Sequence, residues 1–146
     1  MVFDHTKTKF SEIIPSKLDK VSDLISDIVK KLDFLPLDDL GRSNVKLCLQ
    51  ETVVNAIKHG NKCDEKKKVK IEFSVEKDDL IIEVTDQGDG FDIKTLPDPT
   101  HDDNLRKLQG RGIFVIYKLM KKVESTNSGR TIRMTMQLKK KERKED

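Results

Sequence analysis

The sequence predicts an α+β fold, a two-layer sandwich in which helices cover one face of a mixed, largely antiparallel sheet. Segments with alternating apolar residues occur in pairs joined by short polar turns, as in β-hairpins, and helical segments are few. The expected order is strand, helix, helix, strand, strand, loop, helix, strand, strand. This order differs from the strict strand–helix alternation of a doubly wound sheet. The chain also lacks the G-x-x-x-x-G-K-[ST] pattern, which excludes a P-loop.

The first 61 residues are predicted to contain one strand and two helices. "TKFSEIIP", residues 8–15, is the first strand and ends at a proline. Ser16 and Asp19 resemble a capping box at the start of a helix. The apolar stripe of this helix consists of Leu18, Val21, Ile25, Ile28, Leu32 and Leu35. Pro36 ends it, and residues 37–61 form a second helix with Gly60 and Asn61 as its C-cap.

The remaining residues are predicted to form a hairpin, a long loop, a helix and two strands, of which the last has a clear apolar alternation. Alternating apolar residues place strands at 69–75 and 80–86, with "EKDD" as the turn between them. "GRGIFVIYKLMKKV", residues 110–123, opens with two glycines and continues as a helix. After a turn at "NSGR", the strand "TIRMTMQL" occupies residues 131–138.

Length and charge favour a single domain over residues 1–138, followed by a charged and disordered tail at residues 139–146. The net charge of the whole chain is +3, and the tail alone carries five basic and three acidic residues. The body therefore keeps a charge of only +1, which argues against direct nucleic-acid binding. No signal peptide and no apolar run of about 20 residues is visible, so we expect a cytoplasmic protein without a membrane segment.

The two cysteines, Cys48 and Cys63, are too few for a disulfide framework. A metal site made by these two cysteines and His59 is the alternative, but the paired C-x-x-C spacing of a zinc site is absent. We interpret them as ordinary reduced cysteines.

Three polar features of the sequence suggest a common site. Glu51, Asn55 and His59 are spaced four apart, which places them on one face of the second helix. "DQGDGFD", residues 86–92, follows a strand, and "GRG", residues 110–112, precedes a helix. Each feature alone is common in caps and turns. Together they predict a nucleotide site.

The chemistry of these residues suits ATP and Mg²⁺. The carboxamide oxygen of Asn55 is a hard neutral ligand for Mg²⁺. The backbone N–H groups of residues 110–112 lie at a predicted helix N-terminus, where anions are stabilised, and Arg111 adds a positive charge for phosphates. Asp86 can accept a hydrogen bond from the exocyclic amine of adenine. Gly88 and Gly90 would let the backbone approach the base, and the polar loop at residues 92–109 would cover the nucleotide as a lid.

These segments resemble the N box (residues 51–61), the first glycine box (86–92) and the second glycine box (110–114) of the Bergerat-type ATPases. That superfamily includes gyrase B, Hsp90 chaperones, histidine kinases and mismatch-repair ATPases. The nearest resemblance is to small bacterial anti-sigma factors that are also serine-protein kinases. It covers roughly residues 8–138 with the boxes in the expected order.

The resemblance implies a role for each residue on the nucleotide side. Asn55 would coordinate Mg²⁺, and Asp86 would hold the adenine amine beside Gly90. Contacts to the phosphates would come from Gly110, Arg111 and Gly112. Thr131, after the last turn, is similar to the threonine that supports adenine in the family.

Two further residues are placed by the same helix face. Glu51, one turn before Asn55, would accept the proton of an incoming serine hydroxyl. His59, one turn after Asn55, would be either a phosphate contact or a cation favoured by the helix C-terminus.

The resemblance implies an ATP-dependent serine/threonine-protein kinase that acts as an anti-sigma factor in partner switching. It would phosphorylate a small antagonist protein, bind a sigma factor and form a homodimer. The alternative is a non-catalytic ATP-binding module that sequesters a sigma factor or another regulator. A histidine-kinase catalytic module is disfavoured, because it would need a phosphoacceptor histidine in a dimerisation helix before the ATP domain. None of His5, His59 and His101 lies in such a helix. A gyrase- or chaperone-type ATPase is disfavoured by the absence of a following transducer domain.

Overall fold

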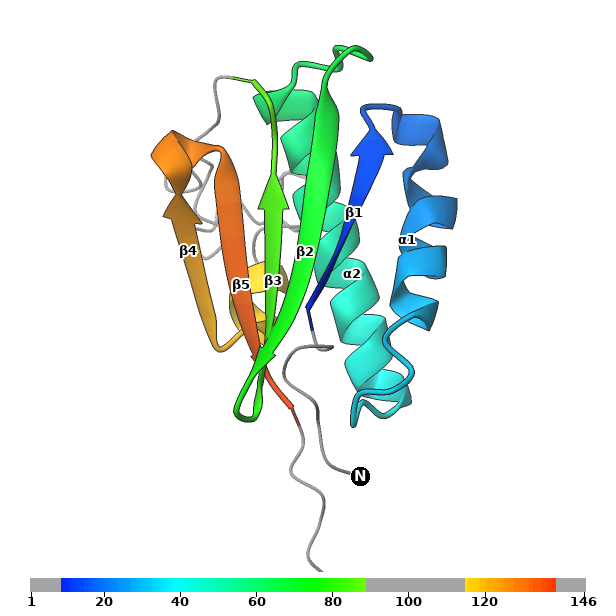
Figure 1. Ribbon diagram of the computed structural model, residues 1–146, viewed down its shortest axis with the longest axis vertical. Coiled ribbons are helices and arrows are strands. Elements are labelled where there is room, and N and C mark those ends of the chain that lie inside the picture. Colours follow the sequence, from blue (N-terminus) through cyan, green and yellow to red (C-terminus); the bar gives the residue numbers. More distant parts are fainter. Residues whose placement is uncertain (1–8, 89–114, 139–146) are drawn as a thin grey trace, which may run out of the picture.

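The computed structural model describes residues 9–88 and 115–138, which form a five-stranded sheet with helices packed on one face (Figure 1). The strand order is β1-β2-β3-β5-β4, and each neighbouring pair is antiparallel. This arrangement confirms the predicted α+β two-layer class. β5 lies between β3 and β4, so the strand order in the sheet differs from the order along the chain. Short hairpins between consecutive strands alone would not produce this order.

The strands and helices have the following bounds. The strands are β1 (Phe10–Pro15), β2 (Lys68–Glu76), β3 (Asp79–Thr85), β4 (Lys122–Thr126) and β5 (Thr131–Gln137). The helices are α1 (Val21–Lys30) and α2 (Asp39–Asn55), and residues 115–119 are also helical. Shorter helical turns are η2 (Leu18–Lys20), η3 (Ala56–Gly60) and η5 (Asn127–Gly129).

The core lies between the sheet and the two long helices. Phe73, Ile82 and Met134 occupy paired positions on β2, β3 and β5, and all three are at most 1% exposed. Their side chains share the face of the sheet toward the helices, because residues directly opposite in neighbouring strands point the same way. Phe10 of β1 stacks on Phe73 with 4.8 Å between ring centroids. From the helix side, Ile25 and Leu49 are fully buried in the same cluster.

The start of the first helix differs from the sequence prediction. Ser16 caps no helix: its hydroxyl donates to the Lys67 carbonyl (2.7 Å) and accepts from the Asn61 carboxamide (2.9 Å). α1 begins at Val21 after the turn η2, and no side-chain capping bond is present there. Ser16 is only 3% exposed, so its hydroxyl must bond to neighbouring buried groups, and these groups belong to distant segments. Leu18, assigned to the apolar stripe, is 42% exposed.

The prediction of a helix over residues 110–123 places the helix end too late in the chain. In the described part of the chain the helix ends at Leu119, and Lys122 and Val123 begin β4. Val123 lies opposite Met134 of β5. Pairing with β5 in a hairpin satisfies the backbone groups of this segment, and it overrides the weak helical preference of the lysine-rich sequence.

The second helix is also more complex than a single run over residues 37–61. Asp38 is its N-cap, and the Asp38 carboxylate accepts from the Gly41 N–H at 2.7 Å. α2 then continues into the wider turn η3, in which the Asn61 N–H donates to the Ala56 carbonyl, five residues earlier, at 2.8 Å. Asn61 is the C-cap residue, as predicted. Within the described residues, no helix has the length and apolar character needed to span a bilayer.

We expect Leu49→Ala to lower the free energy of unfolding by about 2–5 kcal/mol, because Leu49 is fully buried between α2 and the sheet. Leu47, two residues earlier on α2 and 43% exposed, provides a matched control: Leu47→Ala should change stability by less than about 0.5 kcal/mol. Urea denaturation of both variants measures the difference. Equal losses would contradict the assignment of the buried face of α2.

Candidate functional site

The polar stripe of α2 predicted to carry chemistry lies next to the buried face of this helix. Glu51 and Asn55 are half-buried, one turn apart on α2. Between them, Thr52 is 2% exposed and its hydroxyl bonds to the Cys48 carbonyl (2.7 Å) and to the Met134 sulfur of β5 (3.3 Å). Thr52 thus brings this turn of α2 into contact with β5 between Glu51 and Asn55.

The polar stripe changes character at the end of α2. His59 lies in the π-helical turn η3 and is exposed, while its neighbours Ala56, Ile57 and Gly60 are buried. A π-helical turn at a helix end is often found at functional sites, since it redirects the residues that follow. Here it directs Gly60 and Asn61 into the interior, toward the segment that follows β3.

The end of the helix and the loop after β3 are in very close contact. A Cβ atom added to Gly60 would lie 2.2 Å from Asp86 Oδ2, and one added to Gly88 would lie 1.8 Å from the Gly60 carbonyl oxygen. Both distances are far below van der Waals contact. Gly60 and Gly88 are therefore required by space, and together they bring the segment after Asn55 directly onto Asp86.

Asp86 and Thr131 meet at the same end of the sheet. Asp86 is 2% exposed, its N–H donates to the Arg130 carbonyl (2.9 Å), and its Oδ1 accepts from the Gly88 N–H (2.9 Å). Thr131 is buried at the first position of β5, and its hydroxyl lies 2.9 Å from the Thr85 hydroxyl. The structure thus gathers Asp86, Gly88 and Thr131, three of the predicted residues, and joins them to the end of the helix that carries Glu51 and Asn55.

The other predicted contacts fall on parts of the chain that are not described. Gly90, Gly110, Arg111 and Gly112, together with the loop at 92–109, lie outside residues 9–88 and 115–138. The roles assigned to them stay predictions, as does the disordered tail at residues 139–146.

Two residues near this site were missed by sequence reasoning. Asn61 was assigned only as a helix cap, and yet its side chain is fully buried and connects three separate segments. Arg130 was assigned only to a turn, and its Nε–H donates to the Gly88 carbonyl at 2.8 Å. An Asn after a helix-ending Gly and an Arg in a turn are both ordinary in sequence, so no local pattern distinguishes them.

The cysteines differ in environment. Cys48 is buried in α2, and burial, with a smaller contribution from the charge of Glu51, raises the pKa of its thiol to about 12. Cys63 is exposed, and both thiols are free. Among the described residues, no group of three or more His, Cys, Asp and Glu side chains is arranged to hold a metal ion.

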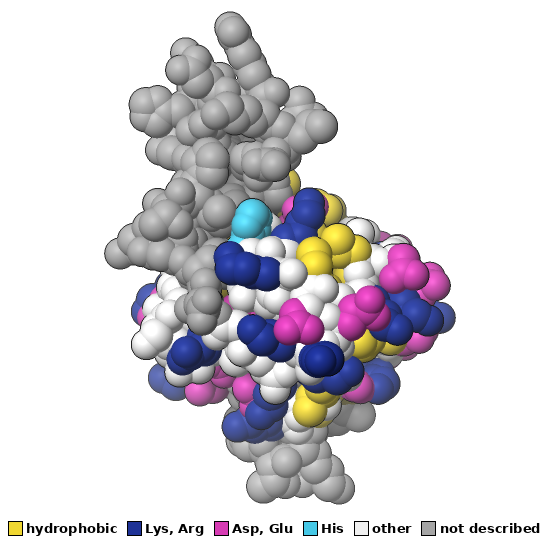
Figure 2. All heavy atoms as spheres, turned by 90° about the horizontal axis from the view of Figure 1, so that it is seen from above, with side chains coloured by type: hydrophobic (Ala, Val, Ile, Leu, Met, Phe, Trp, Pro, Cys, Tyr) yellow, Lys and Arg dark blue, Asp and Glu magenta, His cyan; other side chains and the backbone are white. Residues whose placement is uncertain are grey.

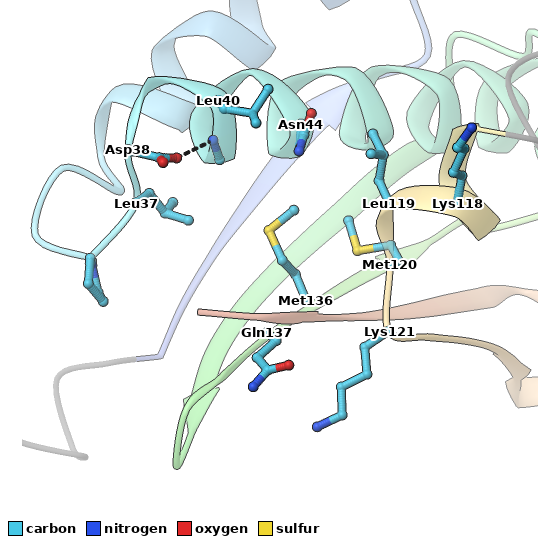
Figure 3. Close-up of a pocket in the computed structure, with 12 residues that line it drawn as sticks. Leu37, Asp38, Leu40, Asn44, Lys118, Leu119, Met120, Lys121, Met136 and Gln137 are labelled. Atoms are coloured by element: carbon cyan, nitrogen blue, oxygen red, sulfur yellow. Dashed lines mark hydrogen bonds between the residues drawn. The ribbon is translucent and has the colours of Figure 1, made fainter. Parts of the chain in front are cut away.

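A separate open groove of about 370 Å³ lies between the start of α2 and the end of β5 (Figure 3). Leu37 and Leu40 line it from the α2 side, and Met120 and Met136 line it from the other. Met136 is near the end of β5, whereas Thr131 is at its start, so the groove is distinct from the candidate site. Viewed from the end where β5 begins, the described surface shows Lys and Arg interspersed with Asp and Glu (Figure 2).

Comparisons with known proteins agree with this geometry. The model of the histidine kinase-like ATPase domain matches residues 14–136. Among solved structures, the catalytic domain of the histidine kinase ThkA matches with a TM-score of 0.52 over 88% of this chain and 97% of that chain. Sequence identity to it is 15%, so this likeness concerns the fold alone.

Curated relatives narrow the comparison. The serine-protein kinase RsbW of Bacillus licheniformis is 33% identical over 118 residues, covering 76% of this chain and 72% of that protein. RsbW of Staphylococcus aureus (strain MRSA252) is 36% identical over 113 residues, covering 70% and 69%. RsbW of Bacillus subtilis (strain 168) is 32% identical over 102 residues, covering 65% and 64%. With the matched domain extending over most of its length, this chain belongs to the histidine kinase-like ATPase domain family.

Proposed function

We propose that this protein is an ATP-dependent serine-protein kinase that regulates its partners by phosphorylation. The observation that carries the proposal is the contact of Gly60 with Asp86 and of Gly88 with Gly60. It joins the helix bearing a carboxylate and a carboxamide to a buried carboxylate suited to adenine. The similarity of this chain to RsbW proteins, which are serine-protein kinases by name, supports the same activity.

The described residues fit a bound adenine nucleotide with Mg²⁺. Asp86 is a buried hydrogen-bond acceptor, and Thr131 beside it offers a hydroxyl that can donate or accept. Asn55 provides a neutral oxygen and Glu51 a carboxylate, both of the hard type that Mg²⁺ prefers. Asp86 and Thr131 would hold the adenine, and Asn55 would hold Mg²⁺.

The chemistry of transfer requires a base and a fixed geometry. Bound ATP would supply the phosphoryl group, and Mg²⁺ would offset its charge. Glu51 would accept the proton of the serine hydroxyl as the oxygen attacks, which is the role of a positioned general base. The regular helix α2 itself holds Glu51 and Asn55 one turn apart, and its buried face packs in the core, so little reorganisation would be needed during the reaction.

The partners follow from the resemblance to anti-sigma factor kinases. The substrate would be a small antagonist protein with a serine acceptor, a sigma factor would be the regulated partner, and the kinase would act as a homodimer. His59, exposed beside this site, would contact phosphate or serve as a helix-terminal cation. The second candidate function, sequestration without catalysis, uses the same nucleotide site and differs only in the role of Glu51.

Glu51→Gln should reduce phosphotransfer by about 10²-fold or more, because the amide cannot accept the hydroxyl proton. Nucleotide affinity should change little, since the side-chain shape is kept. The measurement is transfer of labelled phosphate from ATP to a candidate antagonist protein encoded in the same genome. Glu76→Gln is the control, because Glu76 is an exposed carboxylate at the β2–β3 hairpin, away from α2.

Undiminished transfer by Glu51→Gln would remove Glu51 from the base role. A wild-type protein that binds ATP and a sigma factor, but transfers no phosphate to any candidate antagonist, would favour the sequestering function.

Asn55→Ala should lower ATP affinity by more than about tenfold, or ~1.4 kcal/mol, when Mg²⁺ is present. Without Mg²⁺ the variant and wild type should bind ADP similarly, because the adenine contacts remain. Calorimetric titration with and without Mg²⁺ measures both effects. Asn44→Ala is a matched control on the same helix, at the groove of Figure 3. It should leave the affinities for ATP and for ADP unchanged, both with and without Mg²⁺. Equal loss with and without Mg²⁺ would argue against a metal role for Asn55.

A further inference from the structure

We propose that Arg130 and Asn61 are positioning residues that clamp residues 86–88 from two sides and thereby set the affinity and base selectivity for adenine nucleotides. This inference rests on the proposed function, because it concerns the same nucleotide site. Neither residue needs to touch the nucleotide. Each fixes the backbone of the loop that carries Asp86.

The Arg130 side of the clamp uses both its backbone and its side chain. The Arg130 carbonyl accepts from the Asp86 N–H at 2.9 Å, and the Arg130 Nε–H donates to the Gly88 carbonyl at 2.8 Å. One residue of the turn before β5 therefore holds the loop at both of its ends. A guanidinium donor makes the second bond charge-assisted, which is stronger than a bond between neutral groups.

The Asn61 side holds the middle of the loop. Asn61 Oδ1 accepts from the Gln87 N–H at 2.8 Å, while Asn61 Nδ2 donates to the Ser16 hydroxyl (2.9 Å) and the Lys68 carbonyl (3.0 Å). The Gln87 side chain adds another bond, since its Oε1 accepts from the Lys68 N–H at 2.6 Å. The loop is thereby fastened to the ends of β1 and β2 as well as to the turn before β5.

Together these bonds fix the three consecutive backbone N–H groups of the loop. Asp86 donates to Arg130, Gln87 donates to Asn61, and Gly88 donates to the Asp86 carboxylate. The carboxylate is consequently oriented before any ligand arrives. Ordering a recognition loop in advance lowers the entropic cost of binding, so the clamp should act on nucleotide affinity rather than on the phosphoryl-transfer step.

Arg130→Ala tests the clamp, because the residue is exposed and its loss leaves the core intact. We expect Kd for ATP and for ADP to rise by the same factor, roughly tenfold, the scale of one charge-assisted hydrogen bond. The preference for ATP over GTP should shrink, KM should rise and kcat should stay unchanged. Arg130→Lys keeps the charge but lacks the Nε–H. Its Kd values should rise by nearly as much as those of Arg130→Ala.

Arg133→Ala is the control, because Arg133 lies three residues after Arg130, on β5, and carries the same charge, with Glu76 as an ion-pair partner at 3.9 Å. It should leave both affinities unchanged. A larger loss for ATP than for ADP, or full retention by Arg130→Lys, would overturn the clamp and assign Arg130 a direct phosphate contact. Unchanged affinity in Arg130→Ala would also overturn it.

Amide hydrogen exchange separates failure of the clamp from failure of the proposed function. In the nucleotide-free protein, the amides of Asp86 and Gln87 should be protected, and Arg130→Ala should reduce the protection of Asp86. If wild type binds no adenine nucleotide, the proposed function fails, and the clamp's role in affinity fails with it, even where this protection is found. If wild type binds nucleotide but Arg130→Ala leaves exchange and affinity unchanged, the clamp alone fails.

Discussion

The buried carboxamide of Asn61 is the interaction on which the rest of this site depends. It is fully buried and joins the ends of β1 and β2 to the loop after β3 through Ser16, Lys68 and Gln87. Leaving one of these buried groups without its partner would cost about 1–3 kcal/mol. The ends of β1 and β2, the loop after β3 and the turn that carries Asn61 therefore keep one relative arrangement. That arrangement fixes the end of α2 beside Asp86.

The consequence for function is a division of work between two connected elements. In the proposed function, α2 would present Asn55 for metal binding and Glu51 for proton transfer, and the loop after β3 would present Asp86 for base recognition. The contacts at Gly60 and Gly88 leave no room for a Cβ atom at either residue, so both glycines are needed for these elements to lie against each other.

Nonlocal contacts also explain where the elements depart from local expectation. Ser16 has the sequence context of a helix cap but is recruited by Asn61 and the Lys67 carbonyl. Lys122 and Val123 continue a helical pattern but pair with β5 instead. In both cases hydrogen-bonding groups find partners outside the predicted helix, and these bonds outweigh the local helical propensity.

The sequence by itself determined the α+β class, the alternating strands and the face of α2 that bears Glu51 and Asn55, while its resemblance to the Bergerat-type ATPases supplied the expected roles of Asp86 and Thr131. Periodicity and residue chemistry are local properties, so they can be detected without knowing what lies opposite. Only the tertiary structure decided the strand order, the placement of Asp86 against Gly60, and the parts played by Asn61 and Arg130. These depend on contacts between residues 26 to 82 positions apart, such as Asn61 with Gln87 and Thr52 with Met134. No local pattern records such contacts, because the partners are brought together only when the sheet and helices pack.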